Sequence, residues 1–260
     1  MDLGLRDKIV LITGGTSGIG LAVAQRLAAE GCRIAICGRD KSKLDRAVAS
    51  VASIEAKGFV ADICKPGDVA SLVADVVRTF GGTDIVVSNA GTHLPGRLGE
   101  VTPDRLLAHF QTKVMGAWEL ARHVTPGMVA RGGGRFIVII GQAGKVPQAN
   151  AIASATINAA QHAFVKSLSD ELAPKNILVN AVCPSRIKSP LTDALTLHNE
   201  VYYGRSLEQQ QQKWGAEVPL GHWGTPDDIA NAVAFLASSR AAYIVGANID
   251  VDGGHQRSII

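Results

Sequence analysis

The chain has 260 residues, of which 47% are hydrophobic and 19% charged, a balance typical of a folded globular protein and not of a disordered one. A formal net charge of +3 and an aromatic content of 5% give no basis for a nucleic-acid partner. No apolar run approaches the roughly 18 residues that a membrane-spanning helix needs, so we expect no membrane partner either.

The start of the chain and its cysteines narrow the class further. The first ten residues, MDLGLRDKIV, contain no apolar signal core, so we expect a cytoplasmic protein. Four cysteines are too few for a disulfide scaffold, and their spacing is not that of metal ligands. We interpret them as buried free thiols and expect no metal site; they are Cys32, Cys37, Cys64 and Cys183.

Short apolar runs alternate with longer helical patterns along almost the whole chain. In chain order, strands are predicted at residues 8–12, 33–37, 58–61, 84–88, 135–140, 177–182 and 248–251. Between and after them, helices are predicted at residues 19–29, 41–56, 66–80, 102–128, 151–172 and 226–236. Strands that are apolar throughout and separated by helices indicate a parallel sheet covered on both faces. We therefore predict one doubly wound α/β domain over residues 1–260.

A glycine-rich turn follows the first predicted strand and opens the first predicted helix. Such a turn lets the backbone approach a pyrophosphate, while the helix N-terminus presents free N–H groups and a partial positive charge to the anion. The strand–turn–helix context favours a dinucleotide site over an ordinary turn. The residues expected to contact the cofactor here are Gly14, Ser17, Gly18, Ile19 and Gly20.

The second predicted strand is followed by Arg39. Many dinucleotide folds place an acidic residue at this point, against the adenosine ribose 2′-hydroxyl. A guanidinium instead suits a 2′-phosphate, through paired charge-assisted hydrogen bonds. We therefore expect NADP as the cofactor, with NAD the less favoured choice. The alternative is that Arg39 is only a solvated residue at a strand end.

Residues 190–214 interrupt the alternation of strands and helices. They contain a run of four glutamines at 209–212, two tyrosines and few residues suited to a core. A substrate lid, formed by a loop or a mobile helix, fits this composition, and so does a solvated surface helix.

The glycine turn and four later motifs resemble the short-chain dehydrogenase/reductase family over essentially the whole chain. The later motifs are Asp62 after the third strand, Asn89-Ala90-Gly91 after the fourth, and residues 180–184 and 251–254. The resemblance implies a single-domain Rossmann fold with a seven-stranded parallel sheet, assembled as a homo-tetramer or homo-dimer.

The resemblance also implies which further residues approach the cofactor. Asp62 and Ile63 would flank the adenine, and Asn89, Ala90 and Gly91 would pass by the ribose. Pro184, Ile187 and Ser189 would lie at the nicotinamide end, with Ser185 standing where the family usually has glycine.

Members of the family usually handle the substrate oxygen and its proton with a Ser-Tyr-Lys set and an Asn. Aligned by the end of the predicted helix 151–172, the tyrosine position falls on Ser154 and the lysine position on Asn158. The serine position falls on Gly141, and the asparagine position on Lys113. This alignment predicts that all four usual residues are replaced.

In this alignment, lysine and asparagine have exchanged places. The hypothesis is that Lys113 supplies charge or a proton near the nicotinamide, with Ser154 as a local relay beside Asn158. The alternative is coincidence, with Lys113 reaching solvent or making a structural bond. His93 is a further candidate acid, and His162 could extend a polar wall along the helix, although either histidine could instead be structural.

Three functions are compatible with this pattern. The first is an NADP-dependent oxidoreductase acting on a small-molecule carbonyl or alcohol with a non-standard catalytic site. The second is a non-redox lyase, isomerase or hydrolase on the same scaffold, and the third is a non-catalytic cofactor-binding subunit. We take the first as the prediction because the dinucleotide-binding features are well preserved.

Overall fold

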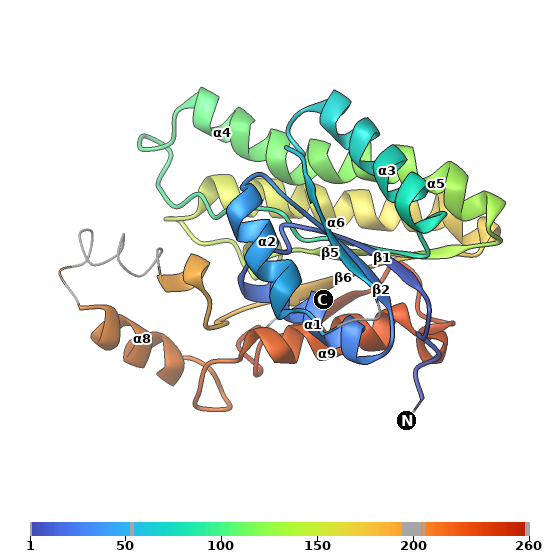
Figure 1. The fold of residues 1–260 in the computed structure, drawn as a ribbon. Helices are drawn as coiled ribbons and strands as arrows, with labels where there is room; N and C mark the ends of the chain where they lie inside the picture. Colours follow the sequence, from blue (N-terminus) through green and yellow to red (C-terminus); the bar gives the residue numbers. More distant parts are fainter. Residues whose placement is uncertain (1, 53–54, 194–203, 205, 258–260) are drawn as a thin grey trace.

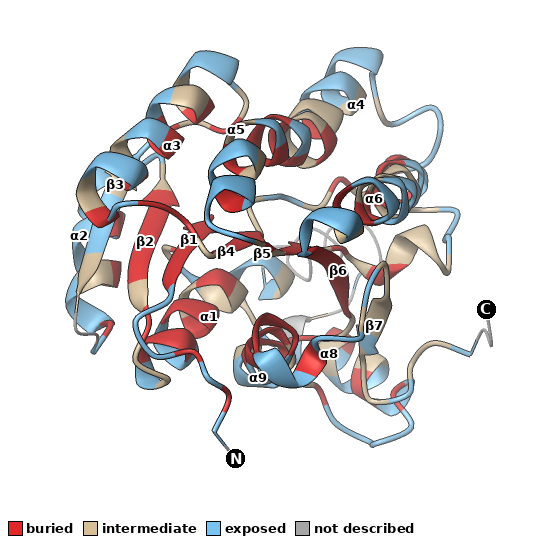
Figure 2. Cartoon of the chain, turned by 90° about the vertical axis from the view of Figure 1, so that its right-hand side faces the viewer, coloured by how far each residue is buried: buried red, intermediate tan, exposed pale blue. Residues whose placement is uncertain are grey.

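A computed structural model describes residues 2–52, 55–193, 204 and 206–257. Within them, seven strands form one sheet (Figure 1), and every neighbouring pair is parallel. The strand order is β3-β2-β1-β4-β5-β6-β7, as labelled in Figure 2. The strands are β1 (Ile9–Thr13), β2 (Arg33–Gly38), β3 (Ala56–Val60), β4 (Ile85–Ser88), β5 (Gly134–Ile139), β6 (Ile177–Pro184) and β7 (Asn248–Val251). The predicted seven-stranded parallel fold is confirmed.

Helices cover both faces of this sheet. They are α1 (Gly18–Ala29), α2 (Lys41–Ser50), α3 (Pro66–Phe80), α4 (Pro103–Phe110), α5 (Gly116–Ala130), α6 (Ile152–Leu172), α8 (Leu207–Ala216) and α9 (Pro226–Ala237). Alternate residues of β1 point to opposite cores: Val10 and Ile12 pack with α1 and α9, and Ile9 and Leu11 pack with α3 and α5. Figure 2 shows the buried sheet between these two layers.

Two predicted helices differ from the structure. The helix expected at 41–56 ends at Ser50, because Val51 is extended and the chain then enters β3, which pairs with β2. The helix expected at 102–128 is divided by a π-helical segment, Gln111–Met115, between α4 and α5. Such segments often occur at functional sites, and this one contains Lys113.

The strand order places a crevice at one edge of the sheet. From β1 the chain extends outward through β2 to β3, and from β4 it extends the opposite way through β5 and β6 to β7. In sheets of this kind, ligands bind beyond the carboxyl ends of the strands at the point where the order reverses. Here that point lies between β1 and β4, where the glycine turn and Asn89 follow their strands.

Much of the predicted lid at 190–214 lies outside the described residues. Its described part includes the first two turns of α8, which begins at a capping box between Ser206 and Gln209. Trp223 Nε1 donates to Gln211 O at 2.9 Å and ties the helix to the following loop. In the described parts of the chain, we find no helix with the length and apolar character needed to span a bilayer.

Candidate functional site

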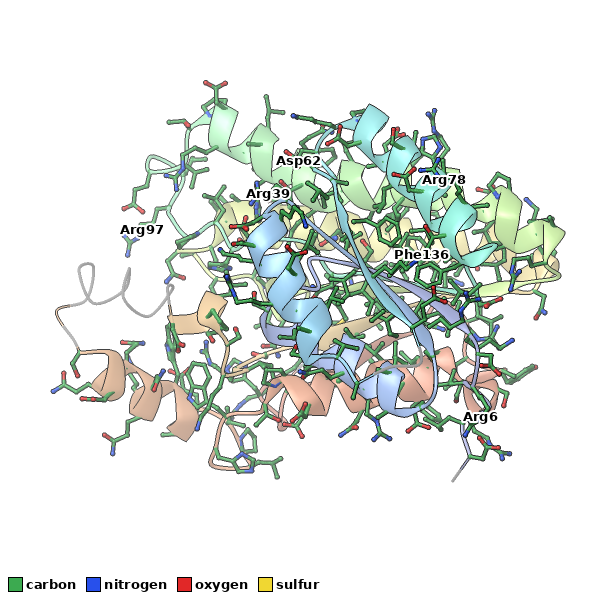
Figure 3. The ribbon with its side chains drawn as sticks, viewed as in Figure 1. Arg6, Arg39, Asp62, Arg78, Arg97 and Phe136 are labelled. Atoms are coloured by element: carbon green, nitrogen blue, oxygen red, sulfur yellow. The ribbon has the colours of Figure 1, made fainter. Side chains whose placement is uncertain are left out.

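Two adjoining cavities occupy the crevice at the carboxyl ends of the strands. The first, of about 340 Å³, lies over the ends of β1 to β4, and the second, of about 270 Å³, lies over the ends of β4 to β6. They share the lining residues Ile19, Asn89, Gly91, Thr92, Ser189 and Leu191. Figure 3 shows Arg39 and Asp62, which both line the first cavity, and Phe136, which lies in the core.

Three positions of the turn require glycine, either for their backbone conformation or for lack of space. Gly14 and Gly18 have φ values of 65° and 53°, a region that L side chains rarely adopt. Gly20 has an ordinary backbone, but an added Cβ would lie 2.4 Å from Gly14 O and 2.5 Å from Asn89 Nδ2. Asn89 in turn donates to Thr13 O and Gly14 O, both at 3.1 Å, and so holds the turn against β4.

The N-terminus of α1 faces the first cavity with backbone N–H groups that are available as hydrogen-bond donors. Ser17 is the residue that precedes the helix, and among the described residues its side chain makes no capping hydrogen bond. The first N–H groups of a helix have no partner within the helix and carry a partial positive charge. With the glycines beside them, they form a site suited to a phosphate group.

Arg39 lines the first cavity, whereas its acidic neighbour is occupied elsewhere. Asp40 caps α2 by accepting from Lys43 N at 3.0 Å, and it also accepts from Ser42 Oγ at 2.9 Å. These hydrogen bonds hold the pKa of the Asp40 carboxyl below its ordinary value, and the bond from the Lys43 backbone has the larger effect. Arg39 has no ion pair or side-chain hydrogen bond among the described residues, so its guanidinium is available to a ligand.

The residues predicted to bind the cofactor are brought together along this crevice. Those that line the first cavity are Gly14, Ser17, Gly18, Ile19, Gly20, Arg39, Asp62, Ile63, Asn89, Ala90, Gly91 and Ser189. The remaining two, Pro184 and Ile187, line the second cavity.

Lys113 and Asn158 meet at the wall of the second cavity. The Lys113 ammonium donates to Asn158 Oδ1 at 2.7 Å, and Asn158 Nδ2 donates to Gly141 O at 2.8 Å. The lysine stem passes against Gly91, where an added Cβ would lie 3.0 Å from Lys113 Cε. Desolvation lowers the pKa of Lys113 from 10.5 to about 8. Near neutral pH, the group is therefore a cation that can release its proton.

Ser154 takes a different place from the one predicted. Its hydroxyl accepts from Leu94 N at 3.0 Å, donates to Leu94 O at 3.1 Å and lies 3.4 Å from His93 Nδ1. The loop after β4 therefore engages the Ser154 hydroxyl, and Ser154 does not line the second cavity, so the role of local relay predicted for it stays a prediction. His93 itself does line the second cavity.

Of the three residues predicted to form a polar wall along α6, only Asn158 lines the second cavity. His162 lies one turn further along and its Nδ1 is 2.8 Å from Asn248 Oδ1, so the ring faces β7. Burial lowers the pKa of His162, which favours a neutral ring in that position.

Sequence reasoning missed His109, which lies beside the lysine site. It is four residues before Lys113, and its Nδ1 lies 3.1 Å from Thr92 Oγ1. Burial, with smaller contributions from Lys113 and His93, lowers the pKa of His109 to about 4. The ring is therefore neutral near pH 7 and adds no second charge beside the ammonium. The i, i+4 spacing to Lys113 was the signal that could have found it.

A group of residues that the sequence did not predict also lines the second cavity. It consists of Gln142, Ser185, Arg186, Trp214, Trp223 and His255, drawn from five separate segments of the chain. His255 Nδ1 lies 2.8 Å from Gln142 Oε1 and 3.0 Å from Ser185 Oγ. Ser185, at the position where glycine was expected, thus becomes part of a polar network.

Comparisons with known proteins agree with the fold described above. A family model described as enoyl-(acyl carrier protein) reductase matches residues 14–256. A 3-oxoacyl-(acyl-carrier-protein) reductase FabG of Staphylococcus epidermidis is 35% identical over 265 residues, covering 95% of this chain and 98% of its own. Among solved structures, L-sorbose reductase from Gluconobacter frateurii, complexed with NADPH and L-sorbose, matches with a TM-score of 0.94 at 32% identity, covering 100% of both chains. Actinorhodin polyketide ketoreductase with NADPH also matches with a TM-score of 0.94 at 32% identity, over 97% of this chain and 98% of that one.

Proposed function

The chain belongs to the short-chain dehydrogenase/reductase family, and on that premise we propose that it is an NADP-dependent oxidoreductase that interconverts a carbonyl compound and its alcohol. We further propose that Lys113 is the proton donor, in a non-standard site where the family's usual catalytic residues are replaced. The observation that carries this proposal is the Lys113 ammonium, held by Asn158 at the wall of a cavity that adjoins the nucleotide crevice.

The first cavity suits the phosphate-bearing part of a dinucleotide, whose nicotinamide would reach toward the second cavity at Pro184 and Ile187. The close-packed glycines and the uncapped N-terminus of α1 suit a pyrophosphate, and Arg39 suits a 2′-phosphate. The relatives whose structures contain NADPH have the same fold over almost their whole length, which supports the same cofactor here. NADPH, when bound, would supply the hydride.

The residues of the second cavity would handle the substrate oxygen. During reduction, that oxygen gains negative charge and needs a proton. We assign this proton to Lys113 Nζ, which becomes a neutral amine as the carbonyl becomes an alcohol. In the oxidative direction the neutral amine takes the proton back. Asn158 fixes the ammonium, and Gly141 O fixes the Asn158 amide in turn.

Tyrosine is not placed to do this work in the described structure. Tyr243 is fully exposed, and the other two tyrosines, Tyr202 and Tyr203, lie outside the described residues. His93 lines the cavity and could contact a substrate, while Ser154 fixes the loop that carries it. The relatives named above are all reductases, which supports a redox function over a lyase, isomerase or hydrolase.

A panel of carbonyl compounds, followed by NADPH absorbance, tests the proposed function. We expect at least one compound to be reduced with one NADPH consumed per alcohol formed, and the reverse reaction with NADP and that alcohol. Tight NADPH binding without turnover of any carbonyl in the panel would contradict the oxidoreductase assignment and favour a cofactor-binding subunit.

The charge of Arg39 is expected to determine the preference for NADPH over NADH. Replacing Arg39 with alanine should raise the dissociation constant for NADPH by roughly 10- to 100-fold, since charge-assisted hydrogen bonds to a phosphate are lost. The dissociation constant for NADH, which lacks that phosphate, should change little. Cofactor fluorescence measures both values. Arg6→Ala, which Figure 3 shows far from Arg39, is the matched control, and equal losses of NADPH and NADH affinity would contradict the assignment.

The pH dependence follows from the lowered pKa of Lys113. Reduction needs the ammonium form, so kcat/KM should be constant below about pH 7 and fall as pH rises through about 8. Oxidation needs the neutral amine, so its rate should rise through the same range. Initial rates in both directions, measured with overlapping buffers, check the two opposite slopes. A reduction rate that does not fall through pH 8 to 9 would exclude Lys113 as the donor.

A further inference from the structure

The charged side chains that line the second cavity all have the same sign. Among its described lining residues, the ionised groups are Lys113 and Arg186, and no aspartate or glutamate is present. Two histidines, His93 and His255, complete the titratable set. Lys113 is assigned above to the substrate oxygen, so Arg186 remains as a second cation with no role in the proposed reaction. A cavity lined by one sign of charge favours a ligand of the opposite sign.

Arg186 is held rigidly in place. Its backbone adopts a φ of 52°, and its guanidinium carbon lies 4.7 Å from the centre of the Trp214 ring. Arg186 Nη2 donates to Glu217 Oε2 at 2.7 Å, and the side chain is 16% exposed. An arginine fixed in this way loses little conformational freedom when a ligand binds.

The ion pair with Glu217 leaves donor capacity on the guanidinium. That bond uses Nη2, whereas Nη1 makes no hydrogen bond among the described residues, and Arg186 lines the cavity. Arg186 Nε is buried and therefore out of reach of a ligand. Glu217 is the more exposed partner, with 40% of its side chain accessible, and it does not line the cavity. Arg186 therefore has Coulomb attraction and N–H groups to offer to a second carboxylate.

Ser185, next to Arg186, has a hydroxyl that accepts a hydrogen bond from its neighbours and keeps its own proton available. Gln142 Nε2 donates to Asp252 Oδ2 at 3.0 Å, so Gln142 Oε1 faces His255 Nδ1, which must carry the proton of that contact. The same Nδ1–H faces Ser185 Oγ, which is left to act as the acceptor. The serine O–H is then free to donate to another group in the cavity.

We propose that Arg186 and Ser185 form a carboxylate-binding subsite, and that the substrate is a small oxo acid or the corresponding hydroxy acid. This inference rests on the proposed function, because it assigns the second cavity to the substrate. The carbonyl lies at the Lys113 end and the carboxylate at the Arg186 end. A cavity of about 270 Å³ is of a size for a small molecule of this kind. Trp214 and Trp223, with ring centres 6.0 Å apart, would cover the chain between the two ends.

A binding measurement that needs no turnover tests this subsite. The protein is saturated with NADP and titrated with oxo acids of increasing length, from 3-oxobutanoate to 6-oxoheptanoate, each paired with its methyl ester. Tryptophan fluorescence reports binding because Trp214 and Trp223 line the cavity, whereas Trp118 lies on α5 against Phe164. We expect at least one acid to bind about 10- to 100-fold more tightly than its ester. Equal affinity for acid and ester at every length would overturn the proposal.

Three variants separate recognition of the carboxylate from a structural role of the ion pair. Arg186→Gln should abolish the preference for the acid, whereas Glu217→Gln, which breaks the same ion pair but keeps the cation, should retain or increase it. Arg78→Gln removes an arginine paired with Asp75 on the outer face of α3 and is the matched control. A loss of preference in Glu217→Gln as large as that in Arg186→Gln would show a structural pair and overturn the subsite.

The same experiment distinguishes failure of the subsite from failure of the proposed function. Reduction of neutral ketones with no preference for acids would leave the oxidoreductase assignment intact and reject the subsite. Binding that favours the acid through Arg186, with no oxidation of NADPH, would support the subsite and reject the oxidoreductase.

Discussion

Replacing Lys113 with methionine is expected to lower kcat for carbonyl reduction by about 10² to 10⁴-fold, the usual contribution of a general acid. Methionine keeps most of the length of the side chain against Gly91 but has no proton to give. The dissociation constant for NADPH should change little, since the glycine turn and Arg39, which would hold its phosphates, line the first cavity and Lys113 does not. Steady-state rates under saturating substrate, together with cofactor titrations, measure the two quantities separately.

A second variant distinguishes proton donation from charge alone. Lys113→Arg retains a cation, but a guanidinium holds its proton too strongly to release it near neutral pH. We therefore expect this variant to be as slow as Lys113→Met. Lys166→Met, on the exposed side of α6, is the control. A rate near that of the native protein in Lys113→Arg would mean that the site needs positive charge and not a proton.

Replacing Gly20 with alanine is expected to weaken NADPH binding by roughly 100-fold or more, because a shift of about 1 Å in a binding residue can have an effect of that size. The new Cβ would overlap Gly14 O at 2.4 Å, and backbone atoms cannot move aside as the end of a side chain can. The turn must then open away from the geometry that accepts a pyrophosphate. Titration by cofactor fluorescence measures the loss.

A matched substitution shows whether the loss belongs to the turn. Gly67→Ala also changes a helical glycine, and an added Cβ there meets no atom within 4 Å. This control should bind NADPH as the native protein does and be equally or slightly more stable, since alanine restricts the unfolded chain. Native affinity in Gly20→Ala would contradict the assignment of this turn to the cofactor.

The sequence predicted the architecture well because the sheet is parallel and buried. Strands such as β1 and β6 are apolar on both faces, so the pattern alone identifies them. The prediction of one continuous helix over residues 102–128 was wrong, because the local sequence pattern contains no signal for an interruption. Nothing in the helical pattern from 102 to 128 marks the π-helical segment. It contacts another helix, where Gln161 Nε2 donates to Lys113 O at 3.0 Å, and a local pattern does not contain that contact.

The nucleotide side and the substrate side of the site also differ in how much of each the sequence could predict. The nucleotide side follows from one contiguous turn and from single residues at strand ends, so the sequence places it. The substrate side is assembled from distant segments; Gln142 and His255, for example, meet across 113 positions. Helical spacing places Ser154 one turn before Asn158, but it could not show that the loop at Leu94 contacts the Ser154 hydroxyl.

Chemical rescue of Lys113→Ala tests the central claim, that this fold passes its proton through a lysine, most directly. The variant is assayed for NADPH-dependent reduction with increasing ethylammonium or, in parallel, tetramethylammonium, which carries the same charge but no N–H. We predict that ethylammonium restores the rate in a saturable manner and that tetramethylammonium does not. Native turnover in the unsupplemented variant, or equal rescue by both ions, would contradict Lys113 as the proton donor.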